Sequence, residues 1–179
     1  MRFVRLFAVF WALGGGLASA PVASGVSNFH QVNDHIYRGA QPAATSFLNL
    51  ARLGIKTVVD LRDEPDQIRA EKRAVEASGM RFVSIPMHGL SAPTEQAMAR
   101  ALEILNDPES APVFVHCRRG ADRTGTVIAC YRISAEHWRN EKALAEARAL
   151  GMSWVERAMQ HYVLAYRPLP AVMATAAAQ

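Results

Sequence analysis

The stretch from Val113 to Gly125 constrains the fold more than any other part of the chain. It opens with an apolar, β-branched run after a proline, which predicts a buried strand. A second apolar run that begins at Val127 predicts a helix. Between them lies a loop that starts at Cys117 and reaches Arg123 after five intervening residues. A strand that delivers such a loop to a helix N-terminus is an anion-binding arrangement, because backbone N–H groups and the helix dipole both favour negative charge there.

The loop also supplies a nucleophile and a cation. The positive field should stabilise the thiolate of Cys117 and lower its pKa from ~8.5 into the range of roughly 3.5–7.5. Arg123 can donate two parallel N–H bonds to phosphate oxygens, which a lysine cannot do. We therefore expect the loop to hold a phosphoryl group. The expected phosphate-binding residues are Arg118, Arg119, Gly120, Ala121, Asp122, Arg123 and Thr124.

The sequence His-Cys-x5-Arg-Thr-Gly resembles the signature of the cysteine-dependent protein tyrosine and dual-specificity phosphatases. The resemblance continues in Ile36–Pro42 and Gly54–Arg62, and so it runs from about residue 36 to residue 166. It includes exported bacterial members that act on tyrosine-phosphorylated envelope proteins. Rhodanese-like sulfur carriers also present a cysteine on such a loop, but their loop is usually one residue shorter. A plain buried cysteine before a basic loop would explain neither the glycine nor the arginine spacing.

This resemblance implies a two-step hydrolysis. The Cys117 thiolate attacks phosphorus to form a cysteinyl-phosphate, and water then releases inorganic phosphate. Thr124 would donate its hydroxyl to the Cys117 sulfur, and His116 would hydrogen-bond the loop backbone in a structural role. Tyr37 and Arg62 can be interpreted as substrate contacts or as residues that order the sheet edge and the following turn. No cofactor is needed, and we expect no metal because the sequence shows no metal-spaced cluster.

The general acid is where the sequence departs from the family. Related enzymes carry an aspartate on the loop after the strand that matches residues 82–85, and residues 86–95 contain none. A placed acid contributes roughly 10²–10⁴-fold to the rate. Asp122 is the first candidate, since its Asp-Arg-Thr sequence resembles phosphatases in which a loop aspartate is the acid. His88 and Glu95 are the other two candidates. An acid elsewhere in the chain, or no general acid at all, is also an open alternative. Asp122 could instead only brace the loop, and Glu95 could simply belong to the first turn of a helix.

Residues 1–24 have the features of a secretory signal peptide. A basic start precedes the apolar run Leu6–Leu17 and the small residues Ala18-Ser19-Ala20. The apolar run of roughly 12 residues is short against the ~20 that a membrane anchor needs. Without Arg2 and Arg5 the formal net charge falls from +4 to +2, from 18 basic against 16 acidic residues. We therefore expect an exported, periplasmic protein, and the charge gives no argument for nucleic-acid binding.

The two cysteines are expected to stay reduced. Cys130 lies seven residues beyond Arg123, well along the predicted helix, whereas Cys117 lies under the loop. A rise of ~1.5 Å per helical residue places them beyond the ~4.4–6.8 Å Cα separation of a disulfide. Cys130 is therefore predicted to be a small core residue.

Strands alternate with helices through residues 25–168, which we assign to one phosphatase domain, with a disordered tail over residues 169–179. This order predicts an α/β fold with a central mixed, mostly parallel sheet of about four to five strands, flanked by helices, and a helical C-terminal half. The predicted strands are 29–32, 36–38, 56–61, 81–85 and 113–117. The predicted helices are 47–53, 66–77, 94–105, 123–137, 141–150 and 153–165.

The leading hypothesis is a periplasmic phosphomonoester hydrolase that acts on phosphotyrosine in proteins. We expect it to act as a monomer on a phosphorylated protein or a small phosphomonoester, and a membrane-proximal substrate is compatible with export. The first alternative is a phosphoinositide, inositol-phosphate or phospholipid phosphatase. The second is a phosphate-binding module with weak catalysis.

Overall fold

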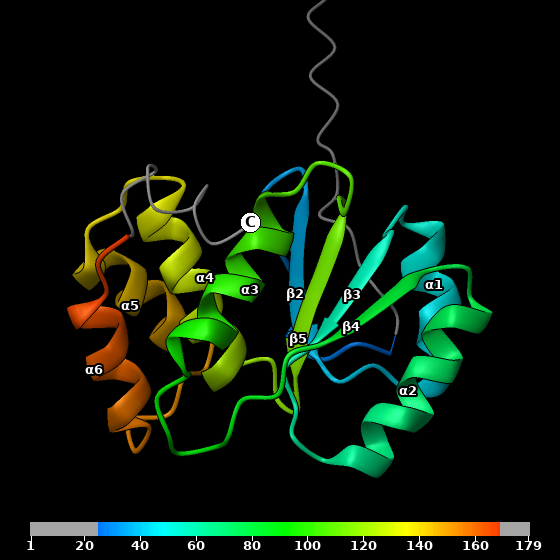
Figure 1. Ribbon diagram of the computed structural model, residues 1–179, viewed down its shortest axis with the longest axis horizontal. Helices are drawn as coiled ribbons and strands as arrows, with labels where there is room; N and C mark the ends of the chain where they lie inside the picture. The colour runs from blue at the N-terminus through cyan, green and yellow to red at the C-terminus, as the bar shows by residue number, and fades with distance from the viewer. Residues whose placement is uncertain (1–24, 169–179) are drawn as a thin grey trace, which may run out of the picture.

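The sheet of the computed structural model, which describes residues 25–168, has the strand order β1-β2-β5-β3-β4 (Figure 1). Strand β1 pairs antiparallel with β2, and the other pairs are parallel, so the predicted mixed, mostly parallel sheet is confirmed. The strands are β1 (His30–Gln31), β2 (Ile36–Ala40), β3 (Thr57–Asp60), β4 (Arg81–Ser84) and β5 (Val113–Cys117).

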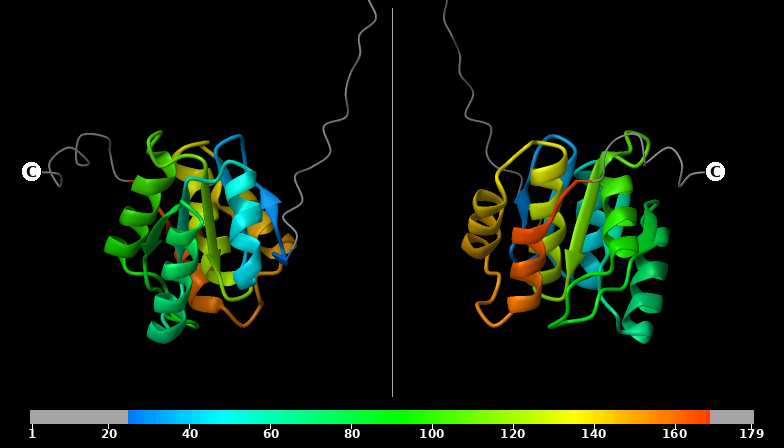
Figure 2. Two further views of the ribbon diagram at one scale, coloured as in Figure 1. Left: turned by 90° about the vertical axis from the view of Figure 1, so that its right-hand side faces the viewer. Right: turned by 60° about the vertical axis from the view of Figure 1, so that its left-hand side comes forward.

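Helices cover both faces of this sheet, as Figures 1 and 2 show. The short 3-10 helix η1 (Ala44–Ser46), α1 (Phe47–Arg52) and α2 (Pro65–Ala77) lie on one side, and α3 (Glu95–Asn106) and α4 (Asp122–Ser134) lie on the other. Two further helices, α5 (Asn140–Ala149) and α6 (Arg157–Ala165), pack on α4 and complete the predicted helical C-terminal half.

The central strand β5 contributes to the core on both faces. Val113, Val115 and Cys117 belong to the cluster that includes α3 and α4 residues, whereas Phe114 belongs to the cluster of α1 and α2. This is the period-2 alternation of a strand buried on both sides. All five β5 residues are at most 2 % exposed. The β-branched run that predicted a buried strand therefore forms the middle of the molecule.

Three strands end close to the expected site. Cys117 is the partner of Ala40 in β2, and His116 is the partner of Asp60 in β3. Because these strands are parallel, the segments after β2, β3 and β5 leave the sheet at the same edge. This is the edge at which α/β proteins generally bind ligands.

Two helix boundaries differ from the prediction by more than one residue. Helix α4 ends at Ser134, short of residue 137, and α6 begins at Arg157 where we predicted Ser153. The second difference has a tertiary cause, because the backbone N–H of Ser153 donates to Oδ1 of Asp122 at 2.9 Å. Residues 153–156 form a turn against the loop that follows β5. The predicted signal peptide and the predicted tail lie outside the described residues. Within residues 25–168, no helix is both long and apolar enough to span a bilayer.

Phe114 anchors the α1 and α2 side of the core, where its ring stacks on Phe29 and on His116. We expect Phe114→Ala to lower the free energy of unfolding by about 3–5 kcal/mol, since it leaves a cavity in a closely packed layer. Urea denaturation measures this loss. Leu48→Ala is the control, because that side chain is 56 % exposed, and it should change the free energy of unfolding by less than about 0.5 kcal/mol.

Candidate active site

Cys117 ends β5 and lines a cavity of about 250 Å³. Its side chain is 2 % exposed, and α4 begins five residues later at Asp122. The sequence predicted that the loop after β5 and the first residues of the next helix would form one site. Residues of both segments line this cavity. Its polar lining is Cys117, Arg118, Arg119, Asp122, Arg123 and Glu156.

The carbonyl groups of the loop are bonded on the side away from this cavity. The Gly120 oxygen accepts from Nη2 of Arg38 at 2.7 Å and from Nδ2 of Asn28 at 3.0 Å. The Arg118 oxygen accepts from the N–H of Gln41 at 3.4 Å. Within the described part of the chain, the N–H groups of residues 118–121 donate to no other protein group. They are therefore available to an anion, as the sequence predicted.

Gly120 lets the loop approach the sheet closely. Its φ of +67° lies in the left-handed region. A Cβ at this position would lie 2.2 Å from the carbonyl carbon of Gly39 in β2. Any side chain here would therefore push the loop away from the strand that positions it.

Arg38 is a site residue that the sequence analysis did not identify. It is 1 % exposed, it lies on β2 beside Val115 of β5, and it donates to the loop at Gly120. Burial lowers the pKa of Arg38 to about 10, although Glu146 and the Cys117 thiolate act to raise it. A buried guanidinium beneath the loop contributes positive charge where a thiolate must form. The available signal was an arginine within an otherwise apolar run next to the central strand.

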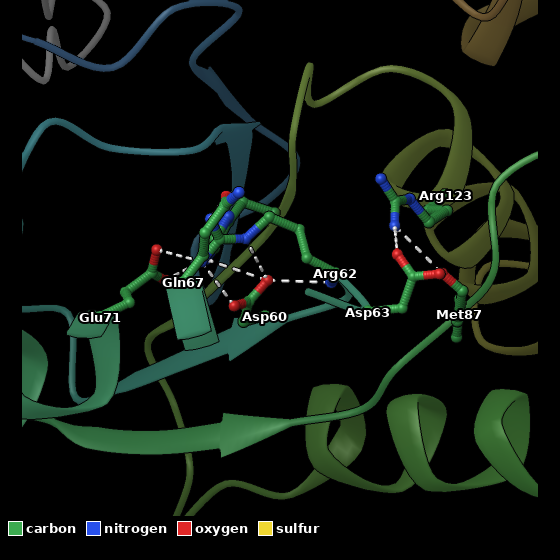
Figure 3. Close-up of polar contacts among 8 residues, drawn as sticks. Asp60, Arg62, Asp63, Gln67, Glu71, Met87 and Arg123 are labelled. Atoms are coloured by element: carbon green, nitrogen blue, oxygen red, sulfur yellow. Dashed lines mark hydrogen bonds and ion pairs between the residues drawn. The ribbon is translucent and has the colours of Figure 1, made fainter. Parts of the chain in front are cut away.

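Arg123 is held by the segments that follow β3 and β4. Its Nη1 donates to Oδ1 of Asp63 and to the carbonyl oxygen of Met87, each at 3.0 Å (Figure 3). Burial alone would raise the pKa of Asp63, but His88 and Arg123 outweigh it and leave the pKa below its usual value. The remaining N–H groups of Arg123 stay available for phosphate oxygens. Asp63 was missed as a site residue, although its place just after β3 beside β5 could have revealed it.

A buried ion-pair network supports the start of the loop. Nη2 of Arg62 lies 2.7 Å from Oδ2 of Asp60 and 2.6 Å from Oε2 of Glu71 (Figure 3). Nε2 of His116 lies 2.6 Å from Oε1 of Glu71, and Nδ1 bonds to no group in the described residues, so the predicted bond from His116 to the loop backbone is not formed in this structure. Arg62 orders the turn after β3 and is not a substrate contact, since it is fully buried.

This network also brings together three groups that could ligate a metal ion. Ligand atoms of Asp60, Glu71 and His116 lie within 4.8 Å of one another. The Arg62 guanidinium, however, already donates to both carboxylates. A metal ion would have to share both carboxylates with this fixed positive charge, so we interpret the cluster as an ion-pair network.

Asp122 lines the cavity, but both of its oxygens are engaged. Oδ1 accepts from the Ser153 N–H, and Oδ2 accepts from Nη2 of Arg119. Neither oxygen is positioned to give a proton to a leaving group in this arrangement. The geometry matches the interpretation in which Asp122 braces the loop.

The other predicted residues are placed as follows. Thr124 is buried and its hydroxyl bonds to no group in the described part, so its predicted bond to the Cys117 sulfur is not formed in this structure. His88 is exposed and lies 2.8 Å from Asp63. Glu95 is the exposed first residue of α3, outside the cavity lining. Cys130 is a free core cysteine, as predicted.

The site combines a thiol at the end of a central parallel strand with unpaired backbone N–H groups and a guanidinium at the start of the next helix. This arrangement is typical of the cysteine-dependent tyrosine and dual-specificity phosphatases. The fold and the loop place this chain in that class. A family model described as "DSP-PTPase phosphatase fused to NAD+ Kinase" matches residues 20–163, and the chain belongs to this family.

Individual relatives divide between two kinds of phosphatase. The chain is 30% identical over 150 residues to the dual specificity protein phosphatase TpbA of Pseudomonas aeruginosa strain UCBPP-PA14, which is 78% of this chain and 66% of TpbA. It is 35% identical over 109 residues to the inositol diphosphatase DSP2 of Oryza sativa, which is 59% of this chain and 53% of DSP2. The chain thus spans between about half and two thirds of these curated relatives.

Solved structures agree with the fold. The crystal structure of P. aeruginosa TpbA matches with a TM-score of 0.69 at 28% identity, covering 86% of this chain and 92% of that one. The core catalytic domain of the PP-IP phosphatase SIW14 from S. cerevisiae matches with a TM-score of 0.68 at 24% identity, covering 85% and 92%. The five-stranded sheet and its helices are therefore shared by both kinds of phosphatase.

Gly120→Ala tests the close approach of the loop to β2. We expect it to weaken binding of orthovanadate, a phosphate analogue, by roughly 100-fold, because the Cβ displaces the N–H groups from their common target. Isothermal titration calorimetry measures the affinity. Gly79→Ala is the matched control, since Gly79 also has a positive φ but has nothing within 4 Å of its Cβ position. Equal losses in the two variants would contradict this role of Gly120.

Proposed function

We propose that this protein is a cysteine-dependent phosphatase that hydrolyses phosphotyrosine in proteins through a cysteinyl-phosphate. The observation that carries the proposal is that Cys117 and Arg123 line one cavity, next to the loop whose N–H groups at residues 118–121 donate to no group in the described part of the chain. These groups would hold the three equatorial oxygens of a phosphoryl group while the sulfur faces phosphorus.

The chemistry follows from that placement. In the first step the Cys117 sulfur forms a bond to phosphorus as the bond to the tyrosine oxygen breaks. In the second step water attacks phosphorus, the S–P bond breaks, and the thiolate is restored with release of inorganic phosphate. The buried Arg38 and the N-terminus of α4 would stabilise the thiolate in both states.

An apolar rim, made of exposed side chains adjacent in sequence to cavity-lining residues, supports an aromatic substrate. We define this rim as Leu90, Trp154 and Val155, which are 68 %, 77 % and 48 % exposed. Leu90 follows the lining residue Gly89, and Trp154 and Val155 precede the lining residue Glu156. Large exposed apolar side chains around a polar cavity are typical of a recognition surface. A tyrosine ring next to the phosphate would find apolar contacts here.

The charges around the cavity favour a single phosphoryl group over a polyphosphate. Arg119 is paired with Asp122, and Arg123 is paired with Asp63. Glu156 adds a carboxyl group to the wall. A densely phosphorylated inositol would need many free cations, and the described cavity offers few beyond Arg118. A TpbA variant has been crystallised with pTyr, which agrees with this choice for a relative.

The second candidate is hydrolysis of inositol pyrophosphates, which the similarity to inositol diphosphatases such as DSP2 favours. Hydrolysis of membrane phosphoinositides would use the same apolar rim. We further propose that the protein works outside the cytoplasm, on the ground of the signal-peptide pattern in residues 1–24. Fractionation of cells that express the full chain tests the location.

A substrate panel tests the proposed function. The full chain should hydrolyse a phosphotyrosyl peptide with a higher kcat/KM than an inositol pyrophosphate or a phosphatidylinositol phosphate in vesicles. Cys117→Ser should reduce every rate to background while it keeps binding of the phosphotyrosyl peptide, because the N–H groups and Arg123 remain. A higher kcat/KM for the inositol pyrophosphate would favour the second candidate. Turnover retained in the serine variant would exclude the covalent mechanism.

Arg123→Lys tests the guanidinium fork. The lysine keeps the charge but cannot bond Asp63, Met87 and two phosphate oxygens together. We expect kcat for p-nitrophenyl phosphate to fall by roughly 10²–10³, as for loss of one transition-state donor. Steady-state kinetics measure it, and Arg100→Lys on the exposed side of α3 is the control. A loss confined to KM would show that Arg123 only binds the substrate.

A further inference from the structure

Glu156 is a buried carboxyl group in the cavity wall that neither the sequence analysis nor the proposed covalent step uses. It lines the same cavity as Cys117 and Arg123, and it is only 8 % exposed. It lies in the turn of residues 153–156, directly before α6, where the sequence predicted continuous helix. The displaced start of α6 is what places this side chain at the cavity.

The carboxyl group of Glu156 is not used to cap the helix. Glu156 occupies the N-cap position of α6, where Ser, Thr, Asp or Asn commonly accepts a backbone N–H, and its longer side chain makes no such bond. Its Oε2 is buried and has no hydrogen-bond partner in the described part of the chain. A buried polar atom without a partner is unusual in a native protein and needs a reason. A substrate oxygen in the cavity would supply one.

The surroundings of Glu156 favour its protonated form. Burial raises the pKa of the Glu156 carboxyl above its usual value, and the negative charge of Asp122 raises it further. Arg119, the backbone N–H of Leu90 and Arg123 act in the opposite direction without cancelling the rise. A bound phosphoryl dianion would add a further negative charge and so would raise the pKa again. These groups, from the loop after β5, α4 and residues 86–94, are the charged and hydrogen-bonding neighbours that face the carboxyl.

We propose that Glu156 is the general acid of this phosphatase and that Asp122 is a positioning residue that holds it in place. The inference rests on the proposed function, because it supplies the proton that the first step lacks. As the S–P bond forms and the P–O bond breaks, the Glu156 proton moves to the leaving oxygen. In the second step the Glu156 carboxylate takes a proton from the attacking water, and the S–P bond breaks to restore the thiolate. The acid is then ready for the next cycle.

Asp122 acts through the turn that carries Glu156. Its Oδ1 accepts the N–H of Ser153, and the Ser153 carbonyl accepts from Nε2 of Gln160, each at 2.9 Å. Both bonds hold Ser153, the first residue of the turn, in place. The charge of Asp122 meanwhile raises the pKa of its neighbour. Asp122 therefore both positions the Glu156 side chain and raises its pKa.

The dependence of kcat on the leaving group distinguishes a general acid from a residue that only holds the loop in place. Glu156→Gln should lower kcat for phenyl phosphate by roughly 10²–10⁴, since phenoxide leaves poorly without a proton. The same variant should lower kcat for p-nitrophenyl phosphate by less than about 10-fold, because that leaving group scarcely needs one. At a pH below the alkaline limb, where Glu156 stays protonated, Asp122→Asn keeps an oxygen for the Ser153 N–H and should slow both substrates by a similar factor. Glu95→Gln, on the exposed start of α3, should change neither.

The pH profile gives a second readout. For the wild-type protein, kcat for phenyl phosphate should fall as pH rises through the pKa of Glu156, because the carboxyl must be protonated when substrate is bound. Glu156→Gln should flatten this alkaline limb. Asp122→Asn should keep the limb and move it to lower pH, because the charge that raises the pKa of Glu156 is gone.

The outcomes distinguish this inference from the proposed function. Absence of wild-type turnover on every phosphomonoester would overturn both. Wild-type turnover with equal losses for the two aryl phosphates in Glu156→Gln would overturn only the role of Glu156. A flattened limb and a leaving-group dependence in Asp122→Asn would assign the acid to Asp122 instead. Circular dichroism of each variant shows that the comparison is made between folded proteins.

Discussion

The site depends on the bonds that hold the loop carbonyls away from the cavity. Arg38 and Asn28 occupy the Gly120 oxygen, so the peptide groups turn their N–H ends toward the anion. Backbone groups that must all be paired cannot adopt this orientation without such donors. The buried cation of Arg38 also adds charge where the thiolate forms. A single side chain from β2 thus contributes to both the shape and the field of the loop that follows β5.

A second set of fixed charges lies at the carboxyl end of β3. Arg62 joins Asp60 to Glu71 in the buried interior, and Asp63, the next residue in the chain, holds Arg123 at the cavity. Buried ion pairs contribute little net stability, but removing one partner leaves an uncompensated charge. Their effect here is to fix the turn after β3 in one geometry. The guanidinium of Arg123 therefore meets the substrate already oriented, which reduces the entropy lost in the transition state.

The sequence predicted what depends on local pattern, and it missed what depends on contacts distant along the chain. The β-branched run before Cys117 predicted the central strand, and the spacing to Arg123 predicted the phosphate loop. Arg38 and Asp63 were missed because their roles come from strands adjacent only in the folded sheet. The predicted start of α6 was too early because the hydrogen bond from the Ser153 N–H to Asp122 overrides the local helix preference of residues 153–156. Glu156 became visible only once that turn was known.

The bonds that assemble the site join segments far apart in the chain. Asn28 contacts Gly120 across 92 residues, Asp63 contacts Arg123 across 60, and Asp122 contacts Ser153 across 31. Such contacts form only when the intervening chain has folded, and they are lost when any one segment opens locally. A partly folded chain would keep its central strand and its cysteine but would lack an ordered anion site. Phosphate affinity is therefore a stricter measure of complete folding than helix content.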